Sequence, residues 1–188
     1  MDKQYRPMVD FLVSEGTDKV PHSSTNFLAH LIGVYTDLGK WGCHEAVCRA
    51  GMFHSIYGTE PFQDFKLGLE RRGEVRELIG ERAERLAYLN SAMTRTTFDE
   101  TVEQGSGPHS MIDRFTGKRV SFSPQEFEDL LNVHLCDWLE QVERYGEWDS
   151  RRAAFRRIAE RLGGIALDSY DEVFAREPRA SMSASAAG

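Results

Sequence analysis

Hydrophobic residues recur mostly at three- and four-residue intervals along this chain, which is the spacing of one face of an α-helix. Residues 27–38 are apolar on most sides, so we expect their helix to be buried on more than one side. The segments predicted to be helical are residues 5–15, 27–38, 44–54, 63–89 (as a helix pair or one bent helix), 124–145, 149–162 and 168–176. The pattern therefore predicts an all-α helical bundle.

The pattern changes in the stretch before the long helix at 124–145. Residues 91–110 are polar, rich in threonine and contain a Gly-Ser-Gly-Pro run, which predicts a loop. Residues 111–122 carry a Thr-Gly turn between two short apolar runs, which predicts one small β-hairpin. Ser123 and Glu126 have the spacing of a capping box, with proline at the first helical position, so the long helix is expected to begin here.

Length and composition favour a single helical domain over residues 1–176, with a flexible tail over residues 177–188. No apolar run reaches the roughly 18 residues of a membrane-spanning helix. The net charge of −7 argues against nucleic acid as a partner, because phosphate binding needs a basic face. An apolar signal region is missing at the start, and the three cysteines make no even disulfide set. We therefore expect a cytoplasmic protein with reduced thiols and a small-molecule substrate; a homodimer remains an open option.

Two histidines and one aspartate stand out within the apolar helical segments. His30 and His54 are 24 residues apart in neighbouring helices, and Asp137 lies in the most apolar part of the long helix. A buried ionised carboxylate needs a cationic partner, since burying it alone costs several kcal/mol. We predict that the three side chains hold one divalent transition metal (Mn, Fe or Zn), for which two imidazoles and a carboxylate are suitable ligands. The competing interpretation is an ion pair between Asp137 and an arginine such as Arg49 or Arg114.

The same residues resemble a known family. His30-Leu-Ile-Gly-Val34 followed by Ala50-Gly-Met-Phe-His-Ser55 is similar to the motifs of the HD-domain superfamily of helical metal-dependent hydrolases. The 24-residue spacing is similar to that of the branch that hydrolyses guanosine tetraphosphate, and Gln141 stands at that branch's amide position after the aspartate. The resemblance covers roughly residues 22 to 145, and it implies an HD-like bundle with His30, His54 and Asp137 as ligands.

The chain departs from that family at the residue after its second histidine. The family has an aspartate there, which bridges two metals in two-metal members, whereas this chain has Ser55. Gly58 and Thr59 likewise replace an acidic pair of the tetraphosphate hydrolases. We therefore expect at most one metal, in an altered and uncharacterised branch of the superfamily.

Three further residues are candidates for proton transfer or ligation. His22 is a candidate general acid or phosphate partner, with a solvent-exposed or capping histidine as the alternative. Glu60 is a candidate proton shuttle, with an ordinary surface glutamate as the alternative. His134 shares the helical face of Asp137 and is the candidate spare ligand or supporting group.

Four residues are candidates for contact with the substrate. Tyr57 and Thr59 follow His54 in a glycine-containing turn and could donate hydrogen bonds, although aromatic packing would also explain Tyr57. Gln141 is the amide beside the predicted site. Arg114 belongs to a short basic cluster on the predicted hairpin, which could hold an anion or simply be exposed.

These observations lead to three hypotheses of function. The first is a metal-dependent hydrolase of a phosphorylated small molecule or nucleotide that uses a metal-bound water. The second is a non-haem iron oxygenase that acts on a small metabolite with the same two-histidine, one-carboxylate site. The third is a metal-free binding protein or cyclase-like enzyme on a degenerate HD scaffold. The sequence does not identify the substrate.

Overall fold

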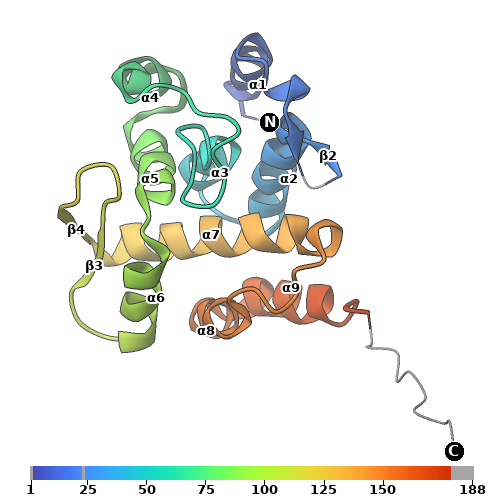
Figure 1. Ribbon diagram of the computed structural model, residues 1–188, viewed down its shortest axis with the longest axis vertical. Helices are drawn as coiled ribbons and strands as arrows, with labels where there is room; N and C mark the ends of the chain where they lie inside the picture. Colours follow the sequence, from blue (N-terminus) through green and yellow to red (C-terminus); the bar gives the residue numbers. More distant parts are fainter. Residues whose placement is uncertain (1, 23, 179–188) are drawn as a thin grey trace, which may run out of the picture.

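The computed structural model describes residues 2–22 and 24–178, and its longest helix, α7 (Pro124–Tyr145), crosses the middle of the molecule (Figure 1). The predicted capping box starts this helix: the Ser123 hydroxyl accepts from the Glu126 backbone N–H (3.1 Å), and the Glu126 carboxylate accepts from the Ser123 N–H (2.9 Å). Gly146 ends it in the left-handed conformation (φ 76°). Because helices pack on both sides of it, α7 buries twelve of its side chains.

One side of α7 carries the helices of the first half of the chain: α1 (Tyr5–Ser14), α2 (Phe27–Lys40), α3 (Glu45–Phe53), α4 (Arg72–Ile79) and α5 (Glu81–Ala92). Of these, α2, α3 and α5 contact α7 directly. Helices α2 and α3 lie close together at Gly51, where the absence of a side chain makes room for the approach. A Cβ at this position would collide with the Leu38 side chain and press on Val34. This close approach holds the histidines of the two helices near each other.

The other side of α7 carries α8 (Arg152–Leu162) and α9 (Gly164–Phe174), which also contact each other (Figure 1). Helix α6 (Arg95–Gln104) packs on α8 and on the strand β3. Short 3-10 turns at Thr17–Lys19 and Leu69–Arg71 complete the helical part. A hydrophobic core that extends from Met8 in α1 to Tyr170 in α9 joins these layers.

In the described residues, two small antiparallel sheets accompany the helices. The predicted hairpin consists of β3 (His109–Ile112) and β4 (Arg119–Phe122), with His109 opposite Phe122. A second pair, which the sequence pattern did not predict, joins β1 (Pro21–His22) to β2 (Thr25–Asn26) just before α2. Asn26 then caps α2 by accepting from the Ala29 N–H. The predicted all-α fold class with a small hairpin is confirmed.

The predicted loop over residues 91–110 is wrong, because residues 95–104 form α6. Phe98, Thr101 and Val102 are buried at helical spacing, so threonine takes part in the buried face that the sequence pattern obscured. In the segment 63–89 the helix-pair alternative is correct, since Gly80 adopts a positive φ (92°) between α4 and α5. Of the predicted tail, residues 179–188 lie outside the described residues.

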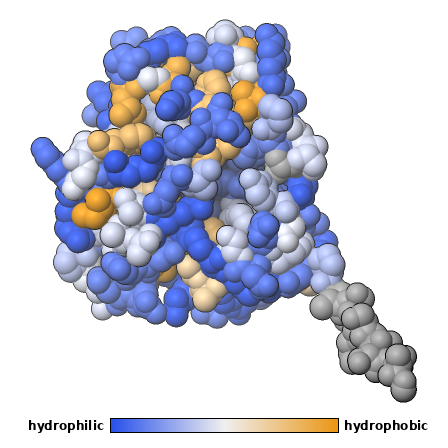
Figure 2. All heavy atoms as spheres, viewed as in Figure 1, coloured by the Kyte–Doolittle hydropathy of each residue, from blue (hydrophilic) through white to orange (hydrophobic). Residues whose placement is uncertain are grey.

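No helix in the described part of the chain is long and apolar enough to cross a membrane. Figure 2 shows one face of the molecule, on which hydrophilic residues predominate and apolar residues gather in the upper half of the view, where α1 to α5 lie. Large hydrophobic side chains that are exposed, such as Tyr145 and Ile165, are scattered, as on most folded proteins.

Candidate metal centre

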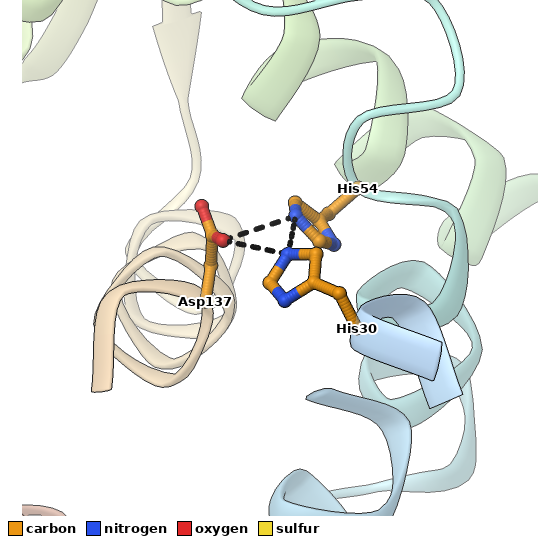
Figure 3. A group of neighbouring side chains, drawn as sticks. All are labelled: His30, His54 and Asp137. Atoms are coloured by element: carbon orange, nitrogen blue, oxygen red, sulfur yellow. Dashed lines mark hydrogen bonds and ion pairs between the residues drawn. The ribbon is translucent and has the colours of Figure 1, made fainter. Parts of the chain in front are cut away.

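His30, His54 and Asp137 meet at one point between three helices (Figure 3). His30 comes from α2, His54 directly follows α3, and Asp137 comes from α7. The Asp137 Oδ1 atom lies 3.1 Å from His30 Nε2 and 3.2 Å from His54 Nε2, and the two Nε2 atoms are 3.3 Å apart. The exposed fractions of the three residues are 1%, 0% and 8%, so the cluster is almost closed to solvent. The predicted three-residue constellation is therefore present.

Hydrogen bonds to the far side of each imidazole decide which nitrogen faces the centre. His54 Nδ1 donates to the Gly51 carbonyl oxygen at 2.7 Å, and His30 Nδ1 donates to the Glu140 carboxylate. A neutral imidazole with its proton on Nδ1 has a lone pair on Nε2. Both Nε2 lone pairs therefore point toward the same carboxylate oxygen, an arrangement that requires a positive charge between them.

Glu140 reaches His30 because α2 has a glycine opposite it. A Cβ at Gly33 would lie only 2.7 Å from Glu140 Oε1, so a larger residue would displace this carboxylate. Arg144 donates to the same Glu140 oxygen that contacts His30 (2.6 Å), which orients the carboxylate. Carboxylates in this supporting position orient metal-bound histidines and make them more basic.

Asp137 is also held by an amide. Gln141 Nε2 donates to Asp137 Oδ1 (2.7 Å), and Gln141 Oε1 accepts from His22 Nε2 (3.0 Å). Burial by itself raises the pKa of Asp137, but the charges and hydrogen bonds of His54 and His30 outweigh it and hold this pKa well below its usual range. Burial lowers the pKa of His30, yet its contacts with Asp137 and Glu140 raise it to about 9. Without a metal, one proton shared within the cluster would supply the cation.

An arginine does not neutralise Asp137. Arg49 is bound to Asp2 and Glu45, and Arg114 donates to the backbone carbonyls of Ser91 and Gly58. Among the described residues, Asp137 forms ion pairs with the two histidines and with no guanidinium. An ion pair between Asp137 and an arginine is thereby excluded for the described part of the chain.

The three ligand atoms have the mutual spacing that a small divalent ion needs. Ligands roughly 2.0–2.2 Å from such an ion are about 3.0 Å apart at a right angle and about 3.4 Å apart at the tetrahedral angle. The observed separations run from 3.1 to 3.3 Å and are nearly equal. Both the geometry and the convergent lone pairs of His30, His54 and Asp137 fit one transition metal with open positions.

A pocket of about 150 Å³ opens onto this centre. Its lining includes His30 and Asp137, so an open position on a metal would face the pocket. Ser55, where the resembled family has its bridging aspartate, also lines the pocket and is 5% exposed. Within the described residues, the carboxylates that line the pocket are Asp137 and the exposed Glu147. A second metal would therefore find no bridging carboxylate at residue 55.

Three of the predicted proton-transfer and substrate residues line this pocket: His22, Thr59 and Gln141. The β1–β2 hairpin, rather than an extension of α2, brings His22 there, and its ring lies 4.6 Å from that of His30 and 4.9 Å from that of Phe62. Burial, and then the neighbouring His30, lower the pKa of His22. The Thr59 hydroxyl accepts from the Phe62 N–H (3.2 Å), which leaves its own proton free to donate.

Four other predicted residues have structural contacts outside the pocket lining. Tyr57 is buried and its hydroxyl donates to Glu84, so its role is in packing, the alternative to substrate binding. Glu60 is exposed and accepts from the backbone N–H of Arg95 at the start of α6. Arg114 binds backbone carbonyls, as described above. His134 is outside the cluster, because its Nε2 accepts from Arg151 (2.8 Å), and it is not the spare ligand.

Sequence reasoning missed two residues of this region. Glu140, which orients His30, follows Asp137 by three positions, and an acidic residue on a helix gives no signal of its own. Arg95 lines the pocket from the first turn of α6, a helix that was predicted to be a loop. The apolar spacing from Phe98 to Val102 was the available signal for that helix.

Residues 11–95 match a family described as a domain of unknown function, DUF6817. The matched range contains His30, His54 and Arg95, whereas Asp137 and Glu140 lie beyond it. No curated protein and no solved structure matches the chain.

Proposed function

We propose that this protein is a metal-dependent hydrolase of a phosphorylated small molecule or nucleotide, on an HD-like helical scaffold. The observation that carries the proposal is the convergence of two imidazole lone pairs on one buried carboxylate oxygen, beside a pocket. The motif resemblance of His30-Leu-Ile-Gly-Val34 and Ala50–Ser55 supports the same class of reaction. Mn, Fe and Zn all suit this ligand set.

In this proposal His30, His54 and Asp137 hold the ion and Glu140 keeps His30 in its ligating tautomer. A bound divalent metal supplies an acidified water as the nucleophile and neutralises charge on a phosphoryl oxygen. Gln141 holds the Asp137 carboxylate in place by its hydrogen bond. The nearly closed environment strengthens these interactions, because the effective dielectric constant is low.

His22 is the residue that best fits proton transfer. It lines the pocket, and its lowered pKa keeps the imidazole neutral at pH 7. Since its Nε2–H is donated to Gln141, its Nδ1 has the lone pair that can accept a proton. Thr59 can donate a hydrogen bond to a substrate oxygen from the same pocket.

The test is hydrolysis of p-nitrophenyl phosphate and of a panel of nucleotides by protein reconstituted with Mn²⁺, Fe²⁺ or Zn²⁺. We expect turnover that chelator abolishes, and a loss of at least about hundredfold in kcat for Asp137→Asn, because the carboxylate ligand is removed. Metal binding without turnover of any phosphate ester would contradict the hydrolase proposal.

The second candidate is the non-haem iron oxygenase, which the two-histidine, one-carboxylate set itself favours. Iron as the metal found in the purified protein, together with oxygen uptake when a metabolite mixture is added, would select it over hydrolysis. The metal-free hypothesis rests on Ser55 and requires that the cluster bind no divalent ion at all.

A further inference from the structure

Arg95 differs from the other arginines of the described chain. Each of the others donates at least one side-chain hydrogen bond or forms an ion pair, whereas the guanidinium of Arg95 does neither. No carboxylate oxygen of the described residues lies within 4.0 Å of it. The side chain is nevertheless partly buried and lines the pocket beside Asp137 and His30.

The neighbouring charges explain why the guanidinium has no internal partner. Arg151 lies close enough to repel it and is itself occupied by Asp99 and His134. Asp137 is committed to the two imidazoles and to Gln141. Glu60 accepts from the backbone N–H of Arg95 and not from its side chain. Burial, and then the charge of Arg151, lower the pKa of Arg95. Both effects disfavour the charged form of the guanidinium in the pocket wall.

We propose that Arg95 is a substrate-binding residue that holds a phosphoryl group in the pocket beside the metal centre. A planar guanidinium can donate two parallel hydrogen bonds to a phosphate, and an arginine held ready in a concave site is the usual recognition element for that group. Ser55, Thr59 and His22 line the same pocket and supply further polar groups for the remaining oxygens. The inference names the substrate group for the site proposed above and rests on that proposal for the reaction, but not for the binding.

The position also predicts an effect on stability. A partly buried cation without a partner destabilises the ligand-free protein, so its removal should not lower the unfolding temperature. This behaviour is typical of functional residues, which trade stability for binding. A structural arginine would show the opposite effect.

The test measures binding of inorganic phosphate by isothermal titration calorimetry to chelator-treated protein. The variants are Arg95→Gln, Arg95→Lys and, as a control with the same change of charge, Arg157→Gln, whose arginine is exposed and pairs with Glu103. We expect about ten- to hundredfold weaker binding for Arg95→Gln, an intermediate loss for Arg95→Lys, and wild-type binding for the control. Thermal unfolding without phosphate should show Arg95→Gln at or above the wild-type midpoint.

The inference would be overturned if the wild type bound no phosphate, or bound acetate more tightly than phosphate. It would also be overturned if Arg95→Gln bound phosphate with wild-type affinity or were clearly less stable than the wild type. Metal content measured on the same samples separates this inference from the hydrolase proposal. Phosphate binding that depends on Arg95 in a protein that takes up no metal would leave the anion site standing and remove the hydrolase. Metal uptake together with phosphate binding that does not depend on Arg95 would remove the role of Arg95 and leave the hydrolase proposal standing.

Discussion

Two buried carboxylates of this protein are neutralised in opposite ways. Glu84 in α5 is 1% exposed and is held by Arg72 (2.6 and 3.0 Å), by Arg76 (3.5 Å) and by the Tyr57 hydroxyl (3.1 Å). Asp137 in α7 is 8% exposed and faces two imidazoles whose far nitrogens are already engaged. Both carboxylates are surrounded by helices, and both accept three or more contacts.

The difference lies in the charge of the partners. Arginine is always protonated, so the charge of Glu84 is balanced within the chain itself. An imidazole is neutral or cationic according to what occupies the site, so the charge of Asp137 is balanced only by a proton or a metal ion. The first arrangement fixes a structure, and the second leaves a place for a ligand. Substitutions in each arrangement should therefore have different effects on metal binding and on stability.

Replacement of His54 by alanine should abolish metal binding. The change removes one of three ligand atoms. Loss of a supporting residue lowers metal affinity by about 10- to 100-fold, so loss of a ligand should lower it by more than about hundredfold. Competition with a chromogenic chelator measures it. His109→Ala is the control, since His109 is also buried but stacks on Phe127 outside the cluster. Equal loss of metal in the two variants would contradict the ligand assignment.

Replacement of Glu84 by glutamine should destabilise the fold without affecting the metal. Removal of one partner of a buried ion pair costs about 3 kcal/mol, because Arg72 then lacks its counter-charge. Urea unfolding measures the loss. Glu74→Gln, in an exposed pair with Arg71, should cost less than about 1 kcal/mol. A Glu84→Gln variant as stable as wild type would contradict a stabilising ion pair at Glu84.

Replacement of Glu140 by glutamine should weaken metal binding and leave the fold intact. The charged acceptor of the His30 Nδ1–H is lost, and such supporting groups are worth about 10- to 100-fold in metal affinity. Gly33→Ala should act in the same direction, because its Cβ would press on Glu140. The exposed neighbour Glu143→Gln is the control. Unchanged affinity in both Glu140→Gln and Gly33→Ala would refute the supporting role.

The smallest effect concerns Asp2, a second carboxylate held by an arginine. The hydrogen bonds from Arg49 lower the pKa of Asp2 to about 2. A lowered folded-state pKa stabilises the protein above the unfolded-state value of about 3.9, and this stabilisation is lost as the pH falls toward 2. Asp2→Asn should therefore cost about 1 kcal/mol at pH 7, with the deficit shrinking below about pH 4. A deficit that does not change with pH would contradict this ion pair. Asp10→Asn, in a highly exposed pair with Arg6, serves as the control.

The sequence was sufficient for the features that depend on spacing. Apolar periodicity located most helices, the Ser123–Glu126 capping box located the start of α7, and buried polar residues at apolar positions identified His30, His54 and Asp137. Each of these signals is local, or depends only on which face of a helix is buried.

The features that depend on the direction of a side chain were not predictable in this way. Tyr57 follows His54 by three positions, but its hydroxyl points to Glu84. Arg114 belongs to the basic cluster of the predicted hairpin, but its guanidinium points to backbone carbonyls. Arg95 enters the pocket from a helix whose threonines hid its buried face. His22 arrives through a two-residue strand pair too short to leave a periodic pattern.

The most direct test of the contrast between Glu84 and Asp137 is elemental analysis of protein purified without chelator, with the Asp137→Ala variant alongside. The account predicts about one equivalent of manganese, iron or zinc per wild-type chain and almost none in the variant. A wild-type protein that carries no transition metal, and takes none up when Mn²⁺, Fe²⁺ or Zn²⁺ is added, would contradict it.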